Sequence, residues 1–282
     1  MRAPLDIGSI LGGTFRIFFS RLPMLFLMAY LPTLLAQLAI MWIIGGFRVQ
    51  LVADPGSVGL STSATWTVFA IVLGLLMVGY GFATALIVPA AYDARLGHRS
   101  RLAAYVGVGL VRFVPVVLIS VVVFACLFLG NLAIYFVFSA VISSIARVLG
   151  SGAGVLLLLA AIPAIYWAAM FSLAVVAIVV ERVGIGAIGR SIHLTKDYRW
   201  PVVGTIILLG LCVGIVGYVL DFAMTRLILA AGIQQFWLFF LTSAATMAIP
   251  MGLMSVGLVL LYARLREIKE GTSVQSLAQV FD

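Results

Sequence analysis

The sequence has very few charged residues. Asp, Glu, Lys and Arg together make up 9% of its 282 residues, whereas 64% are hydrophobic. A water-soluble core of this length cannot bury so much apolar surface. The composition therefore excludes an ordinary soluble globular protein and indicates a chain whose surface is largely covered by lipid.

Residues that bind metals or carry acid–base and nucleophilic chemistry are also scarce. Neither of the two histidines, His98 and His193, has the neighbouring carboxylates that a metal site would need. The two cysteines, Cys126 and Cys212, lie inside apolar runs, where a thiol behaves as a small hydrophobe. No phosphate-binding glycine loop, dinucleotide fingerprint or nucleophile elbow occurs. We therefore expect no catalytic residue, metal, cofactor or disulfide, and we predict that this chain is not an enzyme.

Six apolar runs are long enough to cross a bilayer. Each has about 25 to 30 residues, and about 20 suffice to span the hydrocarbon. The predicted spans are residues 22–46, 65–92, 113–142, 155–180, 201–229 and 236–261. The sequence thus predicts an all-α polytopic membrane protein with a single transmembrane domain over residues 1–271.

The basic residues are divided unequally between the two sets of span ends. Arg48, Arg147 and Arg226 lie on one side, and the other fourteen of the seventeen lie on the opposite side. Because Lys and Arg accumulate in cytoplasmic loops, both termini are predicted to be cytoplasmic, in a bacterial inner membrane. The net charge of +8 comes from these dispersed residues, which flank spans and form no single patch. We therefore expect anionic lipid, and no nucleic acid, as a partner.

The segments before the odd-numbered spans resemble one another. Each joins an amphipathic stretch to a proline that opens the span, where the missing amide breaks no helical hydrogen bond. Each even-numbered span contains an internal proline, where a kink is expected. The prolines are Pro23, Pro115 and Pro201 before the odd spans, and Pro89, Pro163 and Pro250 within the even ones. We predict three pseudo-repeated hairpins with a period of about 90 residues, each preceded by an amphipathic interfacial helix or, alternatively, by an ordinary elbow between spans.

Opposite charges occur together at the predicted cytoplasmic end of every even span. A carboxylate close to hydrocarbon is costly unless it is paired, so Glu181 is expected to contact Arg190 or a basic residue of another repeat. Two interpretations stay open, namely clasps between helices, or a headgroup site or gate. The residues concerned are Asp93, Arg95, Glu181, Arg182, Arg264 and Arg266.

Two basic segments, residues 96–102 and 190–200, combine guanidinium groups with aromatic residues that prefer the membrane interface. Arginine recognises phosphate well, and cardiolipin or phosphatidylglycerol would suit such segments. Anchoring of the topology alone would also explain them. The candidate headgroup residues are Arg99, Arg101, Arg190, Lys196, Arg199 and Trp200.

Small residues in the fifth span predict close helix packing. Gly210, Gly214 and Gly217 leave bare helix surface for a neighbour, which is either another span of this chain or a separate protein. Asp221 and Arg226 are the only charged residues in that run, and we expect them to pair or to snorkel at the outer interface.

Three segments carry a resemblance to a known family: Ile7 to Phe19, Val179 to Lys196, and Leu261 to Gly271. They resemble the membrane domain of glycerophosphoryl diester phosphodiesterases. The resemblance implies a phosphodiesterase, whose chemistry belongs to a separate soluble barrel that uses His, acidic residues and a metal. This chain departs from that pattern, and we expect the barrel to be absent because too few residues follow Gly271. The family-pattern positions are Glu181, Arg190, Ser191, Arg264 and Arg266.

Residues 272–282 are predicted to form a short cytoplasmic helix that Thr272 caps. This helix would dock on the protein itself or on a partner membrane protein. For the whole chain we expect a non-catalytic, lipid-binding scaffold or accessory subunit of a membrane assembly. The alternatives are a small transporter with a pathway between the repeats, and the membrane part of a phosphodiesterase whose catalytic domain is on another chain. Few polar residues near the midplane disfavour transport.

Overall fold

The computed structural model describes residues 5–53, 62–97, 102–149, 161–181, 184, 186–230 and 236–271. Within these ranges the regular secondary structure is helical and no strand occurs. The helices are α1 (Ile7–Ser20), α2 (Leu22–Ala53), α3 (Thr62–Arg95), α4 (Leu102–Leu149), α6 (Ala161–Phe171), α7 (Ala174–Glu181), α8 (Gly186–Thr195), α9 (Arg199–Ala230) and α10 (Phe236–Glu270). The predicted C-terminal helix over residues 272–282 lies outside the described ranges.

Five of the described helices, α2, α3, α4, α9 and α10, are long and apolar enough to cross a membrane. Their apolar runs exceed the about 20 residues that the hydrocarbon thickness requires. The all-helical architecture is therefore that of a multi-pass α-helical membrane protein, as the composition predicts.

The fourth predicted span, residues 155–180, is not one long helix in the part that the structure describes. Its described residues form α6 and α7, which a turn at Ser172 and Leu173 separates. The Ser172 hydroxyl donates a hydrogen bond to the Ala169 carbonyl at 2.9 Å, and such local bonds compete with the helical pattern. Within the described residues of this span, the interruption is therefore at Ser172 and Leu173, and Pro163 lies inside α6.

Helix α4 corrects the prediction of an interfacial helix before each odd span. It runs without interruption through Pro115 and joins the second amphipathic segment to the third predicted span. The other two segments do form separate helices, α1 and α8, because the chain turns after them. Arg21 ends α1, and Asp197 after α8 takes a left-handed conformation with φ 71°. Residues 102–115 contain no such turn, and the helix continues through them into the span.

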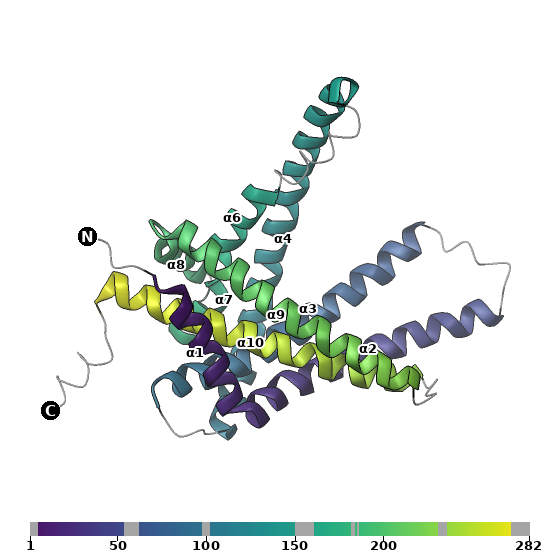
Figure 1. Cartoon of the computed structure of the whole chain (residues 1–282). Coiled ribbons are helices and arrows are strands. Elements are labelled where there is room, and N and C mark those ends of the chain that lie inside the picture. The colour runs from purple at the N-terminus through teal and green to yellow at the C-terminus, as the bar shows by residue number, and fades with distance from the viewer. Residues whose placement is uncertain are drawn as a thin grey trace.

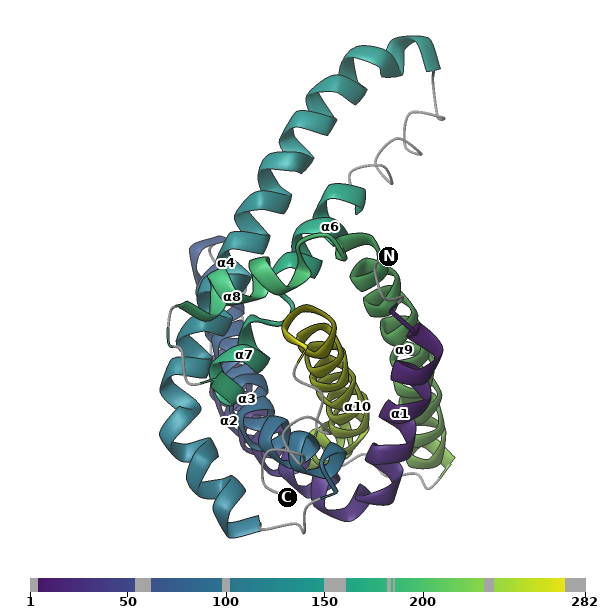
Figure 2. The same ribbon diagram turned by 90° about the vertical axis from the view of Figure 1, so that its left-hand side faces the viewer.

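Helix α10 is the central helix of the bundle. It contacts α1, α2, α3, α7, α8 and α9, and Figure 2 shows these helices arranged around it. In the most apolar 18-residue stretch of α10, 67% of the residues are buried, compared with 17% in the corresponding stretch of α4. Close approach depends on two glycines, since a Cβ on Gly252 would lie 2.5 Å from the Phe18 ring and one on Gly257 would lie 2.3 Å from Leu209.

The hairpins diverge from a common base. Figure 1 shows α4 and α6 extending in one direction, and α2 with α3 and α9 with α10 extending in others. Helices α1, α7 and α8 and the C-terminal end of α10 lie together at the base. Because α10 continues to Glu270, beyond the apolar run, its last two turns bring charged side chains to this base.

Candidate functional site

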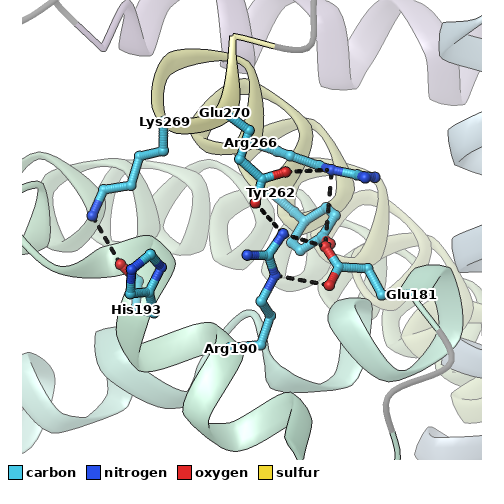
Figure 3. Close-up of polar contacts among 7 residues, drawn as sticks. All are labelled: Glu181, Arg190, His193, Tyr262, Arg266, Lys269 and Glu270. Carbon is cyan, nitrogen blue, oxygen red and sulfur yellow. Dashed lines mark hydrogen bonds and ion pairs between the residues drawn. The ribbon is translucent and has the colours of Figure 1, made fainter.

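The short helix α8 organises the base. Its buried face consists of Ala187, Ser191, Leu194 and Thr195. The Ser191 hydroxyl donates a hydrogen bond to the Met170 carbonyl of α6 at 2.6 Å, which ties α8 to the preceding hairpin. With that face buried, α8 presents Arg190 toward the end of α10, as Figure 3 shows.

Five residues from three helices form what we call the charge cluster: Glu181, Arg190, Tyr262, Arg266 and Glu270. The Arg190 guanidinium donates to both carboxylate oxygens of Glu181, each at 2.8 Å, and it also contacts Glu270. Arg266 donates to Glu270 at 2.9 Å, and the Tyr262 hydroxyl donates to Glu181. Figure 3 shows these contacts joining α7, α8 and α10.

The charges within the charge cluster balance. Two carboxylates face two guanidinium groups, and all four side chains are partly shielded from solvent. Burial alone would raise the pKa of Glu181, but the hydrogen bonds from Arg190 and Tyr262 lower it below its ordinary value. The same hydrogen bond to Glu181 raises the pKa of Arg190. Glu181 therefore stays ionised, and the charge cluster acts as an electrostatic clasp that has no spare charge for a ligand.

A second set of ion pairs connects the end of α3 to α10. Arg95 contacts Glu267 at 2.5 Å, and Arg264 contacts the same carboxylate at 3.2 Å. Asp93, two residues before Arg95, accepts a hydrogen bond from the Tyr105 hydroxyl of α4 at 2.9 Å. The predicted clasp residues thus lie at one end of the bundle, although Asp93 and Arg95 contact different helices. Arg182 lies outside the described residues.

Lys196, Arg199 and Trp200 line an open groove of about 340 Å³ with Tyr166, Asp197 and Pro201, which we call the basic groove. Arg199 donates to the Tyr166 hydroxyl at 2.6 Å, and its guanidinium carbon lies 5.3 Å from the Tyr166 ring centroid. The Trp200 ring lies 5.9 Å from that of Tyr166, and Trp200 is 65% exposed. The basic groove therefore combines two cations with two interfacial aromatic rings.

The six predicted headgroup residues are thus separated in the structure. Lys196, Arg199 and Trp200 line the basic groove, whereas Arg190 lies in the charge cluster and is held by two carboxylates. Arg99 and Arg101 lie outside the described residues.

Of the three predicted packing glycines, one has a neighbour from another helix. A Cβ on Gly217 would lie 3.0 Å from Pro250 of α10, so α9 and α10 approach closely there. Gly210 and Gly214 face open space.

Sequence reasoning did not select Tyr262, Glu270 or Tyr166 as site residues. Glu270 follows Arg266 by four residues, the helical spacing for an ion pair, so the sequence alone could have predicted this pair. Tyr262 and Tyr166 read as interfacial aromatics in an apolar run, and only their tertiary contacts distinguish them. Arg112 likewise donates to the carbonyls of Ile178 and Val179 near the end of α7, a contact that sequence spacing does not indicate.

Comparison of the chain with known protein families, curated proteins and solved structures gives no match. Within the described residues, no group of three or more His, Cys, Asp or Glu side chains is placed to hold a metal ion. The functional inference therefore depends on the geometry of the charge cluster and the basic groove.

Proposed function

We propose that the protein is a non-catalytic, multi-pass protein of the bacterial inner membrane that binds anionic phospholipid at the base of its bundle and acts as a scaffold or accessory subunit of a membrane assembly. In this proposal six crossings form three pseudo-repeated hairpins, α6 and α7 belong to the fourth crossing, and both termini are cytoplasmic. The resemblance to the membrane domain of glycerophosphoryl diester phosphodiesterases supports the assignment as a membrane domain.

The basic groove is the observation that carries the proposal. Its two cations, Lys196 and Arg199, face one carboxylate, Asp197, which also lies 3.9 Å from Lys269. The Arg199 Nε atom is buried and has no hydrogen-bond partner among the described protein atoms. An unpaired N–H beside an exposed lysine and a tryptophan suits an anionic lipid phosphate, because guanidinium groups bind phosphate through several N–H groups at once.

The charge cluster is less suited than the basic groove to bind a lipid phosphate. Its arginines already contact carboxylates, so a lipid phosphate would have to displace Glu181 or Glu270 to bind there. The basic groove, by contrast, places the exposed Lys196 beside an Arg199 guanidinium that retains an unpaired N–H. A groove of this kind suits a protein that holds lipid or a partner in place.

Native mass spectrometry of the purified full chain tests the lipid assignment. We expect cardiolipin or phosphatidylglycerol to be retained by the wild type and about thirtyfold less by the double variant Lys196→Gln, Arg199→Gln, since each basic residue near a lipid surface contributes about 1 kcal/mol. The matched control is Arg16→Gln, Arg264→Gln, which removes two positive charges outside the basic groove. Equal retention by both double variants would contradict specific binding at the groove and leave these residues as topology anchors.

A further inference from the structure

A second groove, of about 500 Å³, lies between α9 and α10 toward the end of the bundle that is remote from the charge cluster. Its lining includes Asp221, Ser243, Thr246, Met247, Met251 and Met254. We call it the Asp221 groove. It shares no lining residue with the basic groove, so a ligand bound in it would be independent of the proposed function.

Asp221 differs from the other carboxylates of the described chain because no hydrogen-bond donor or basic group of the described residues contacts it. Asp6 caps α1, Asp93 accepts from a tyrosine, and the remaining described carboxylates, Glu181, Asp197, Glu267 and Glu270, lie within 4 Å of a basic group. The expected pairing of Asp221 with Arg226 is not present. The Arg226 guanidinium carbon instead lies 5.0 Å from the Phe222 ring centroid.

The Asp221 groove is polar at one end and apolar at the other. Gly217 packs on Pro250 in an antiparallel hairpin, so Asp221, one turn further along α9, lies level with Thr246 of α10. Ser243 adds a second hydroxyl at this end. From Ser243 to Met254 the helix rises about 16 Å, toward the middle of the bundle. Along that length the thioethers of Met247, Met251 and Met254 make the lining apolar and adaptable.

We propose that the Asp221 groove binds an amphiphile with an alkylammonium head group. The Asp221 carboxylate would pair with the ammonium, the hydroxyls of Ser243 and Thr246 would lie beside it, and the alkyl chain would follow the three methionines. A carboxylate at the edge of the hydrocarbon is costly without a cation, and the low dielectric there strengthens its pairing with one. A head group that placed a phosphate at Asp221 would be repelled, so the group that meets the carboxylate must be the ammonium itself.

Photo-crosslinking of the full chain in dodecyl maltoside micelles tests the site. The probe is a dodecylammonium ion with a diazirine on its chain. We expect cross-links in residues 213–221 and 243–254 that excess dodecylammonium suppresses. Asp221→Asn should weaken the apparent affinity about tenfold, since one charge-assisted contact is lost, and Asp221→Glu should retain it. The control Asp6→Asn removes a carboxylate at the start of α1, where Asn also caps a helix well, and should change nothing.

Two results would overturn the proposal: cross-links distributed over other helices, or equal affinity in Asp221→Asn and the wild type. The size-exclusion profile of each variant shows whether it is folded. If Asp221→Asn is not folded, Asp221→Glu is compared with the wild type instead. A second arm repeats the labelling in nanodiscs with and without phosphatidylethanolamine. Displacement of the probe assigns the head group to a lipid amine, and persistence of the label assigns it to a water-soluble amphiphile. Both of these outcomes support a cation site at Asp221.

Discussion

The guanidinium of Arg190 donates two hydrogen bonds to the carboxylate of Glu181, which lies nine residues earlier in the chain. The same guanidinium contacts Glu270, eighty residues later. One side chain of α8 thus connects the end of α7 to the end of α10. Because α10 contacts most of the described helices, this connection fixes the base of the bundle.

Replacement of Arg190 should destabilise the folded protein. Arg190→Gln removes one of the two arginines that contact both Glu181 and Glu270 and leaves Arg266 alone to balance them, so we expect a loss of about 1 to 3 kcal/mol. Arg190→Lys should lose less, because it keeps the charge but not the paired hydrogen bonds to Glu181. The apparent Tm in detergent, followed by circular dichroism, measures the effect. Arg264→Gln is the control, since Arg264 is 42% exposed and its ion pair contributes little. A shift for Arg190→Gln no larger than that of the control would contradict the clasp.

The clasp should also weaken in acid. The pKa of Glu181 in the folded protein lies below its ordinary value of 4.5, so the unfolded chain takes up the proton first as the pH falls. The stability that Glu181 contributes is therefore fully present above pH 4.5 and is lost as the pH falls through the lower folded value. As the pH is lowered from about 7 through 4.5 and below, the Tm difference between the wild type and Glu181→Gln should shrink. A difference that is constant over this range would show that the carboxylate charge is not what stabilises the base.

Two glycines offer a matched test of the packing. A Cβ on Gly252 would lie 2.5 Å from the fully buried Phe18 ring, so Gly252→Ala should destabilise by about 1 to 3 kcal/mol through overpacking. A Cβ on Gly214 would meet nothing within 4 Å. Gly214→Ala should be neutral or stabilising, because alanine favours the helix over glycine by about 1 kcal/mol. The Tm of both variants decides this, and a loss for Gly214→Ala would show that a separate helix packs on α9.

The sequence predicted an all-helical membrane protein with long apolar helices, because such helices need only apolar length. The apolar pattern predicts that the last span ends near residue 261, but α10 continues to Glu270, where Gly271 with φ 65° ends it. A helix does not stop where hydrocarbon ends, since its hydrogen bonds continue into the interface. That extension carries Arg266, Glu267 and Glu270 to the base.

Local pairs were easier to predict than distant ones. Glu181 and Arg190 are close in sequence, and the cost of an unpaired carboxylate was enough to associate them. The contacts of Glu270 with Arg190 and of Glu267 with Arg95 connect residues 80 and 172 positions apart, which no local spacing specifies. The break between α6 and α7 was also missed, because a serine in an apolar run gives a weaker signal than the nearby Pro163.

The proposed orientation can be tested by cysteine accessibility in a chain whose Cys126 and Cys212 are replaced by alanine. In that background, Ser57→Cys follows the first predicted span and should be labelled by an impermeant maleimide from the periplasm. Ser273→Cys follows the last span and should be labelled only after the inner membrane is permeabilised. The reason is that fourteen basic residues lie at the ends of the bundle that include Arg190 and Lys269, and moving Lys and Arg across the membrane is costly. Cytoplasmic labelling at position 57 or periplasmic labelling at position 273 would show that the predicted topology is inverted or wrong. An inverted protein would place the basic groove at the periplasmic face and the Asp221 groove at the cytoplasmic one. This measurement therefore determines from which side of the membrane each proposed ligand must arrive.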